Sequence, residues 1–121
     1  MLSVLCEKIG DMAVIDCEGR IVTSQENSKF RDAVTSQPDA HIVVLDFSEV
    51  DYIADGGLGT LGYLQDWSCD HNIQLKLFNP TSSLRHVLEQ ANLLSELSIA
   101  SLDEMMVLLD RAEHPPLKRA A

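Results

Sequence analysis

The side chains best suited to do chemistry in this sequence lie close together between residues 46 and 55. They are Asp46, Ser48, Glu49, Asp51 and Asp55. Carboxylates at this spacing could hold a divalent metal, and a single aspartate could accept a phosphoryl group. Which of these roles is open depends on the elements that position the side chains.

The acidic segment follows a predicted strand and precedes a predicted helix. Residues 42–45 form a β-branched and aliphatic run, which is typical of a strand buried on both faces, and we expect Asp46 to end it. Leu58, Leu61 and Leu64 recur at helical spacing, so we expect a helix to begin near residue 56 or 57. Functional sites in open α/β sheets gather at the carboxyl ends of strands, where this predicted loop lies.

The N-terminal part predicts a hairpin and a helix. Residues 2–9 and 12–17 read as strands joined by a turn at residues 10–11, with a loop at residues 18–20. Thr23 and Glu26 have the spacing of a capping box. The helix that it opens ends before Pro38 and carries Phe30, Ala33 and Val34 on its inward face.

The C-terminal part continues the alternation of strands and helices. Residues 73–78 predict a strand, residues 81–90 a helix that Asn92 ends in a left-handed conformation, and residues 97–100 a brief edge strand or a loop. A second capping box at residues 101–104 opens a last helix, with Leu102, Met105, Met106 and Leu109 expected inward. The order predicts an α/β fold, a mixed sheet with four helices packed against it.

Composition limits the classes of function. The 121 residues predict a single domain over residues 1–113 and a flexible tail over residues 114–121. A formal net charge of −10 argues against binding nucleic acid or an anionic membrane, and favours a basic partner surface. With no apolar stretch long enough to span a membrane and no signal peptide, we expect a cytoplasmic protein without membrane insertion. Cys6, Cys17 and Cys69 are expected to be free, buried thiols.

No motif in the sequence assembles a catalytic or metal centre. The four histidines are dispersed, and no nucleophile elbow, phosphate-binding loop or dinucleotide pattern is present. A phosphate-accepting receiver domain would need an acidic pair after its first strand and a lysine after its fifth, and neither is found. We therefore expect no enzyme activity, no metal and no cofactor.

Four segments together resemble the STAS domain family. They are the Val-Leu-Asp-Phe-Ser end of the buried strand, the Val50-x-Tyr52-Ile53 step, the Gly57-Leu58-Gly59 helix start and the later Leu-Phe-Asn-Pro at residues 77–80. The family includes anti-sigma factor antagonists of bacterial partner-switching systems and the cytoplasmic domains of sulphate transporters. The resemblance spans about residues 2–112 and implies a STAS-like fold.

The resemblance also implies a protein-binding regulatory module. In phosphorylatable members a serine heads the helix after the third strand, typically in Asp-Ser-Ser-Gly, and its phosphorylation releases a kinase-type anti-sigma factor. The corresponding residues here are Ala54-Asp55-Gly56-Gly57, so Asp55 stands at the phosphosite. A carboxylate cannot form a phosphate ester of a hydroxyl, and its charge is about −1 against −1.5 to −2 for phosphoserine.

Two features of the helix start have alternative interpretations. Asp55 either caps the helix or also influences partner choice. Gly59 and Gly62 inside the helix must be compensated by close packing or by a flat surface that meets a partner. We expect Thr60 and Tyr63 to face solvent. The predicted partner-binding residues are Ser48, Asp51, Asp55, Gly56, Gly57, Thr60 and Tyr63.

Two other functions remain open from the sequence. The chain could be a STAS subunit of a transporter or larger signalling assembly, or a sensor of a small ligand. Formation of a homodimer is compatible with either. The sequence does not name the partner.

Overall fold

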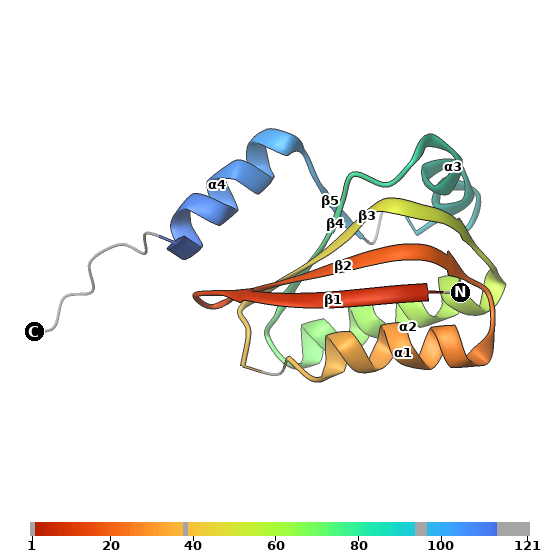
Figure 1. The fold of residues 1–121 in the computed structure, drawn as a ribbon, viewed down its shortest axis with the longest axis horizontal. Coiled ribbons are helices and arrows are strands. Elements are labelled where there is room, and N and C mark those ends of the chain that lie inside the picture. Colours follow the sequence, from red (N-terminus) through yellow and green to blue (C-terminus); the bar gives the residue numbers. More distant parts are fainter. Residues whose placement is uncertain (1, 38, 94–96, 114–121) are drawn as a thin grey trace, which may run out of the picture.

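The fold is a five-stranded mixed sheet with four helices, which confirms the predicted α/β class (Figure 1). The computed structural model describes residues 2–37, 39–93 and 97–113. The predicted tail at residues 114–121 lies outside this range. The elements are β1 (Leu2–Ile9), β2 (Met12–Ile21), α1 (Ser24–Thr35), β3 (Ile42–Ile53), α2 (Asp55–Asp70), β4 (Gln74–Phe78), α3 (Ser82–Gln90), β5 (Ser98–Ala100) and α4 (Leu102–Glu113).

The strands lie in the sheet in the same order as in the chain. β1 and β2 form the predicted antiparallel hairpin, and β2, β3, β4 and β5 run parallel. Gly10 in the hairpin turn has φ +60°, and a Cβ there would collide with the carbonyl of Ala112 near the end of α4. A glycine therefore lets the hairpin turn approach α4 closely.

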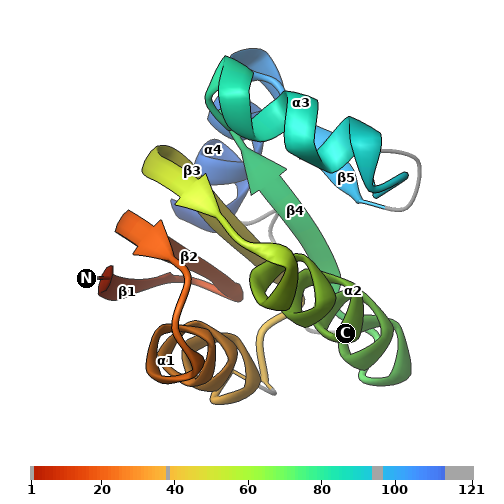
Figure 2. The same cartoon turned by 90° about the vertical axis from the view of Figure 1, so that its right-hand side faces the viewer.

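The sheet has a hydrophobic core on each face. Figures 1 and 2 both show α1 and α2 side by side on one face, with α4 on the other. Phe30, Leu61 and Leu64 from these two helices join the larger core, to which Leu84 and Leu88 of α3 also belong. The smaller core, under α4, contains Met12, Val44, Met105, Leu108 and Ala112.

Two strands are longer than predicted. β2 continues through residues 18–20, which we expected to form a loop, and β3 continues past Asp46 to Ile53. The two extensions pair with each other. The register of this pairing shifts along the strands, as it does at a β-bulge. Phe47, Val50 and Ile53 stay buried while polar side chains face outward, so the acidic segment belongs to a strand and not to a loop.

Helix α4 turns a different face to the sheet than predicted. Met105 is buried as expected and Leu109 packs against the smaller core, but Leu102 and Met106 are 67% and 60% exposed. Leu108 and Ala112 are buried in their place. The Ser101 hydroxyl accepts a bond from the Glu104 amide, so the N-terminal cap was predicted correctly although the inward face was not.

The other helices and the thiols complete the comparison with the sequence. Thr23 caps α1 and Asn92 has φ 59°, both as predicted, and Thr81, which was expected to begin α3, is its N-cap. The cysteines are free, but only Cys17 is buried; Cys6 and Cys69 are exposed. Burial, with the nearby charges of Asp16 and Asp46, raises the pKa of Cys17 to about 12.

Within the described ranges, no helix is long and apolar enough to cross a membrane.

Gly57 sets the distance between α2 and the sheet. It is buried in the first turn of α2, and a Cβ there would overlap the side chain of Ile53 and touch Ile21. Both isoleucines end their strands and are nearly inaccessible. The helix can begin directly after β3 only because residue 57 has no side chain.

We expect Gly57→Ala and Gly59→Ala to change stability in opposite directions. The added methyl at Gly57 enters a filled core and should cost about 1–3 kcal/mol of unfolding free energy. A Cβ at Gly59 meets nothing within 4 Å. The higher helix propensity of alanine should therefore stabilise the Gly59→Ala variant by up to about 1 kcal/mol. Urea denaturation of both variants tests this, and equal effects would contradict the packing described.

The capping box of α1 should make stability depend on acid pH. The Glu26 carboxylate accepts bonds from the amides of Thr23 at 2.9 Å and Val22 at 2.8 Å, which lower its pKa to about 2. Because the pKa of Glu26 is lower in the folded than in the unfolded state, its ionised carboxylate stabilises the fold at pH values above the unfolded pKa near 4.5. This contribution is lost as the pH falls towards 2. The stability difference between wild type and Glu26→Gln should therefore shrink between pH 5 and pH 2, as followed by urea denaturation. A difference that stays constant with pH would contradict this assignment.

Candidate functional site

The candidate site is built around the junction of β3 and α2. Ala54 is the N-cap residue, and its amide donates to the Ile21 carbonyl at 2.9 Å. Its side chain cannot cap the helix. Asp55 is the first helical residue and is exposed, so the expectation that Asp55 caps α2 is wrong by one position. Its carboxylate still lies in the first turn, where the helix dipole favours negative charge.

The glycines of α2 have different roles. Gly57 is buried, so it positions the helix and cannot itself contact a partner. A Cβ at Gly59 or Gly62 would meet nothing within 4 Å, so close packing does not explain these two residues. Of the two alternatives from the sequence, close packing is therefore excluded at these residues, and a surface that meets a partner stays a prediction.

An open hollow lies between α1 and α2, and we call it the α1–α2 hollow. Its volume is about 440 Å³, and it is lined by Arg31, Gly56, Gly59, Thr60 and Tyr63. Tyr63 is 52% exposed, as expected, whereas Thr60 is only partly exposed. Two of these five residues are glycines, which contribute no side chain to the lining, while Tyr63 and Arg31 contribute the largest side chains.

Polar contacts hold the two helices at this hollow. The Thr60 hydroxyl lies 3.0 Å from the Gly56 carbonyl and 3.2 Å from the Asn27 side-chain oxygen. The Asn27 amide group donates to the Thr23 carbonyl at 3.1 Å. The wall contributed by α1 is therefore fixed relative to α2 by side-chain contacts.

Ser48 and Asp51 lie apart from the hollow. The Ser48 hydroxyl and amide both donate to one oxygen of Asp46, at 2.6 and 3.0 Å. Asp46 pairs in register with Asp16 on the sheet face that α4 covers, opposite to the face of α2. Burial raises the pKa of Asp16, and the charges of Asp46 and Glu18 raise it further. Asp51 is exposed on β3.

The predicted acidic cluster is therefore divided. Asp46 and Ser48 belong to one face of the sheet, while Asp55 begins a helix on the other. Among the residues that the structure describes, no three His, Cys, Asp or Glu side chains gather closely enough to hold a metal ion. The arrangement instead offers an exposed carboxylate beside a flat, partly apolar helix surface.

Asn27 and Arg31 were missed from the sequence. They are one helical turn apart on α1, but a capping box followed by polar residues does not indicate which other helix they face. Only the packing of α1 against α2 brings them to Thr60 and Tyr63.

Comparison with known proteins agrees with this architecture. None of the curated proteins matches the chain significantly. An anti-sigma factor antagonist from Mycobacterium paratuberculosis has 14% identity and a TM-score of 0.75, covering 90% of this chain and 94% of its own. RsbS of Moorella thermoacetica, with a serine replaced by glutamate, has 16% identity and a TM-score of 0.72, covering 89% and 95%.

A third similar structure is the anti-sigma factor antagonist SpoIIAA in its unphosphorylated form, with 18% identity, a TM-score of 0.68, and coverage of 90% and 95%. At these identities the likeness shows a shared fold. The family match is more specific, because residues 3–104 match the STAS domain. The chain therefore belongs to the STAS domain family.

Proposed function

We propose that this chain is a non-catalytic regulatory module that binds a protein partner, in the manner of an anti-sigma factor antagonist in bacterial partner switching. Its partner is a kinase-type anti-sigma factor, and the interaction takes place in the cytoplasm. The family match and the fold shared with anti-sigma factor antagonists support this proposal. The histidine bonds described by the structure involve Asp11 and the Trp67 carbonyl and not a nucleophile, which agrees with a binding role.

The exposed carboxylate of Asp55 carries the proposal. It begins α2 next to the α1–α2 hollow. From the resemblance of the sequence to phosphorylatable members of the family, we infer that Asp55 corresponds to their serine. A permanent charge of about −1 at this place is part of the charge that phosphorylation would supply. Among the residues that the structure describes, none forms an ion pair or a side-chain hydrogen bond with the Asp55 carboxylate, which leaves it available to a partner.

The proposed partner surface combines Asp55, Gly56, Thr60 and Tyr63 of α2 with Arg31 of α1. Tyr63 supplies a half-exposed aromatic side chain, the type enriched at binding hot spots. Gly56 and Gly59 leave room for a side chain of the partner to enter the hollow. Asp51 contributes negative charge on β3, and Ser48 is held by Asp46 and takes no direct part.

Replacing Asp55 with serine tests the role of its charge while leaving the start of the helix intact. Asp55→Ser should change the unfolding free energy by less than about 1 kcal/mol, because only a favourable dipole interaction is lost. We expect wild type to remain unmodified with a cognate anti-sigma kinase and ATP. We expect Asp55→Ser to bind that kinase more tightly and to gain a phosphate. Calorimetry and intact-mass analysis measure these outcomes.

Asp55→Ala is the matched control, since it removes the charge without adding a hydroxyl. Equal affinity of the kinase for all three proteins would mean that the carboxylate has no part in partner choice. A phosphate on wild type at Thr60 or Ser48 would contradict the fixed-charge proposal while leaving partner binding intact.

The α1–α2 hollow should be required for partner binding. The double variant Tyr63→Ala with Thr60→Arg removes the aromatic contact and fills the hollow, so its affinity should fall by about tenfold or more. Tyr52→Ala is the control, because Tyr52 is a 45% exposed tyrosine outside the hollow. Calorimetry with the purified kinase at two salt concentrations measures both effects, and acidic residues at the rim should make the wild-type affinity salt-sensitive. A folded double variant that binds like wild type would place the surface elsewhere.

A further inference from the structure

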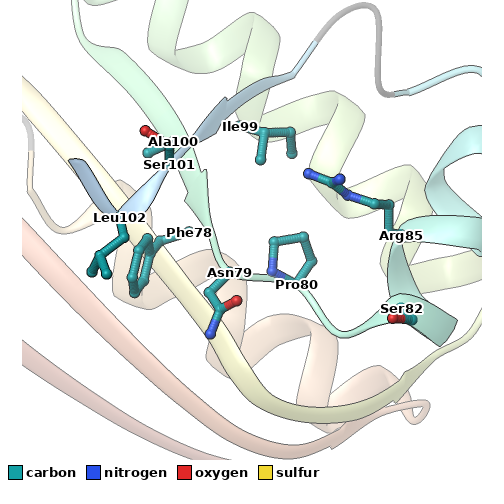
Figure 3. A pocket seen from close by; sticks show the side chains of 9 residues that line it. All are labelled: Phe78, Asn79, Pro80, Ser82, Arg85, Ile99, Ala100, Ser101 and Leu102. Atoms are coloured by element: carbon teal, nitrogen blue, oxygen red, sulfur yellow. The ribbon is translucent and has the colours of Figure 1, made fainter. Parts of the chain in front are cut away.

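A second hollow opens at the carboxyl ends of β4 and β5, and we call it the β4–β5 hollow (Figure 3). Its volume is about 500 Å³, within the range of roughly 300–1,000 Å³ usual for small-molecule sites. β4 leads through Asn79 and Pro80 into α3, and β5 leads through Ser101 into α4. The first residues of both helices, Ser82 and Leu102, therefore line the hollow, at the edge of the sheet where α/β proteins hold ligands.

One side of this hollow is apolar. Phe78 of β4, Ile99 of β5 and Leu102 of α4 line it, and Figure 3 shows Phe78 and Leu102 together at one end. Leu102 is 67% exposed and takes no part in the packing of α4 on the sheet. The exposed Leu102 side chain thus offers an apolar surface that an apolar group of a ligand could cover.

The other side is cationic. Arg85 extends from α3 towards Ile99 and Pro80 in Figure 3, and among the described residues that line the hollow it has the only charged side chain. Within the described part of the chain, Arg85 forms no ion pair or side-chain hydrogen bond. The first turn of α3 contains no acid, whereas the first turn of α4 contains Asp103, which is exposed, and Glu104, which is paired with Lys76 at 2.9 Å. Neither acid lines the hollow, so the charge that its described lining contributes is that of Arg85.

We propose that the β4–β5 hollow binds a small organic carboxylate with a short apolar body. The planar guanidinium of Arg85 matches a carboxylate in a two-bond geometry, and the Ser82 hydroxyl lies on the same wall as a further donor. The apolar body lies against Phe78, Ile99 and Leu102. This site goes beyond the proposed function, because it uses strands and helices other than those of the α1–α2 hollow.

Titration of the isotope-labelled full chain with hexanoate tests the proposal. We expect saturable shifts of the Ser82, Arg85, Ile99 and Leu102 amide signals, with tighter binding of hexanoate than of acetate or inorganic phosphate at equal ionic strength. Arg85→Gln should weaken hexanoate binding about tenfold, as expected for loss of a charge-assisted hydrogen bond. Leu102→Ser should weaken hexanoate and leave acetate unchanged. Arg111→Gln, the same charge change on the exposed side of α4, should bind like wild type.

Three results would overturn the assignment. Shifts that never saturate would show that hexanoate has no site in this hollow. Equal affinity of wild type and Arg85→Gln would remove the anion contact. Tighter binding of phosphate than of hexanoate would mean that the apolar wall is not used. Arg85 and Leu102 are exposed, so these variants should keep the fold, which the unchanged amide signals of β2 and β3 would verify.

Discussion

The contact of Gly57 with Ile53 and Ile21 is the constraint on which the candidate site depends. It joins the ends of two parallel strands to the first turn of α2, in a space that admits no side chain. This contact places Asp55 outside the core, one residue after Ala54, and aligns the rest of the helix along the sheet. The exposed carboxylate, the open glycines and Tyr63 follow from the same placement.

The inward side of α2 packs into the core, and its outward side is open to solvent. Leu61 and Leu64 are fully buried, so the inward side is fixed by the core. On the outward side, Gly59 and Gly62 lower the intrinsic stability of the helix without improving its packing. A helix that gives up stability at exposed positions is typical of surfaces under functional constraint.

Element types could be predicted from the sequence, because apolar periodicity and caps are local signals. The ends of β2 and β3 could not, because Asp46 and Glu49 look like strand breakers until β2 supplies their pairing partners Asp16 and Glu18. Gly56, Thr60 and Tyr63 were named from the sequence and line the α1–α2 hollow, but Arg31 and Asn27 reach it only through the packing of α1 on α2. Leu102 is exposed because α4 packs on the sheet through Met105, Leu108 and Ala112, and the sequence, with apolar residues on several sides of this helix, does not decide which side faces inward.

The strand order, identical to the order in the chain, has a consequence for how the protein folds. Each strand pairs with the one made just before it, but a helix lies between the two strands of every parallel pair, so Met12 of β2, for example, pairs with Ile42 of β3. The loop-closure entropy of such non-local pairs must be lost before their contacts form, which slows the folding of a parallel sheet. During synthesis, every new strand finds its edge already in place on the growing sheet. β5, with three residues, joins last, and its neighbour β4 would be the open edge of any chain released before residue 98. Such a truncated chain would expose an unpaired parallel strand, the kind of edge that promotes aggregation.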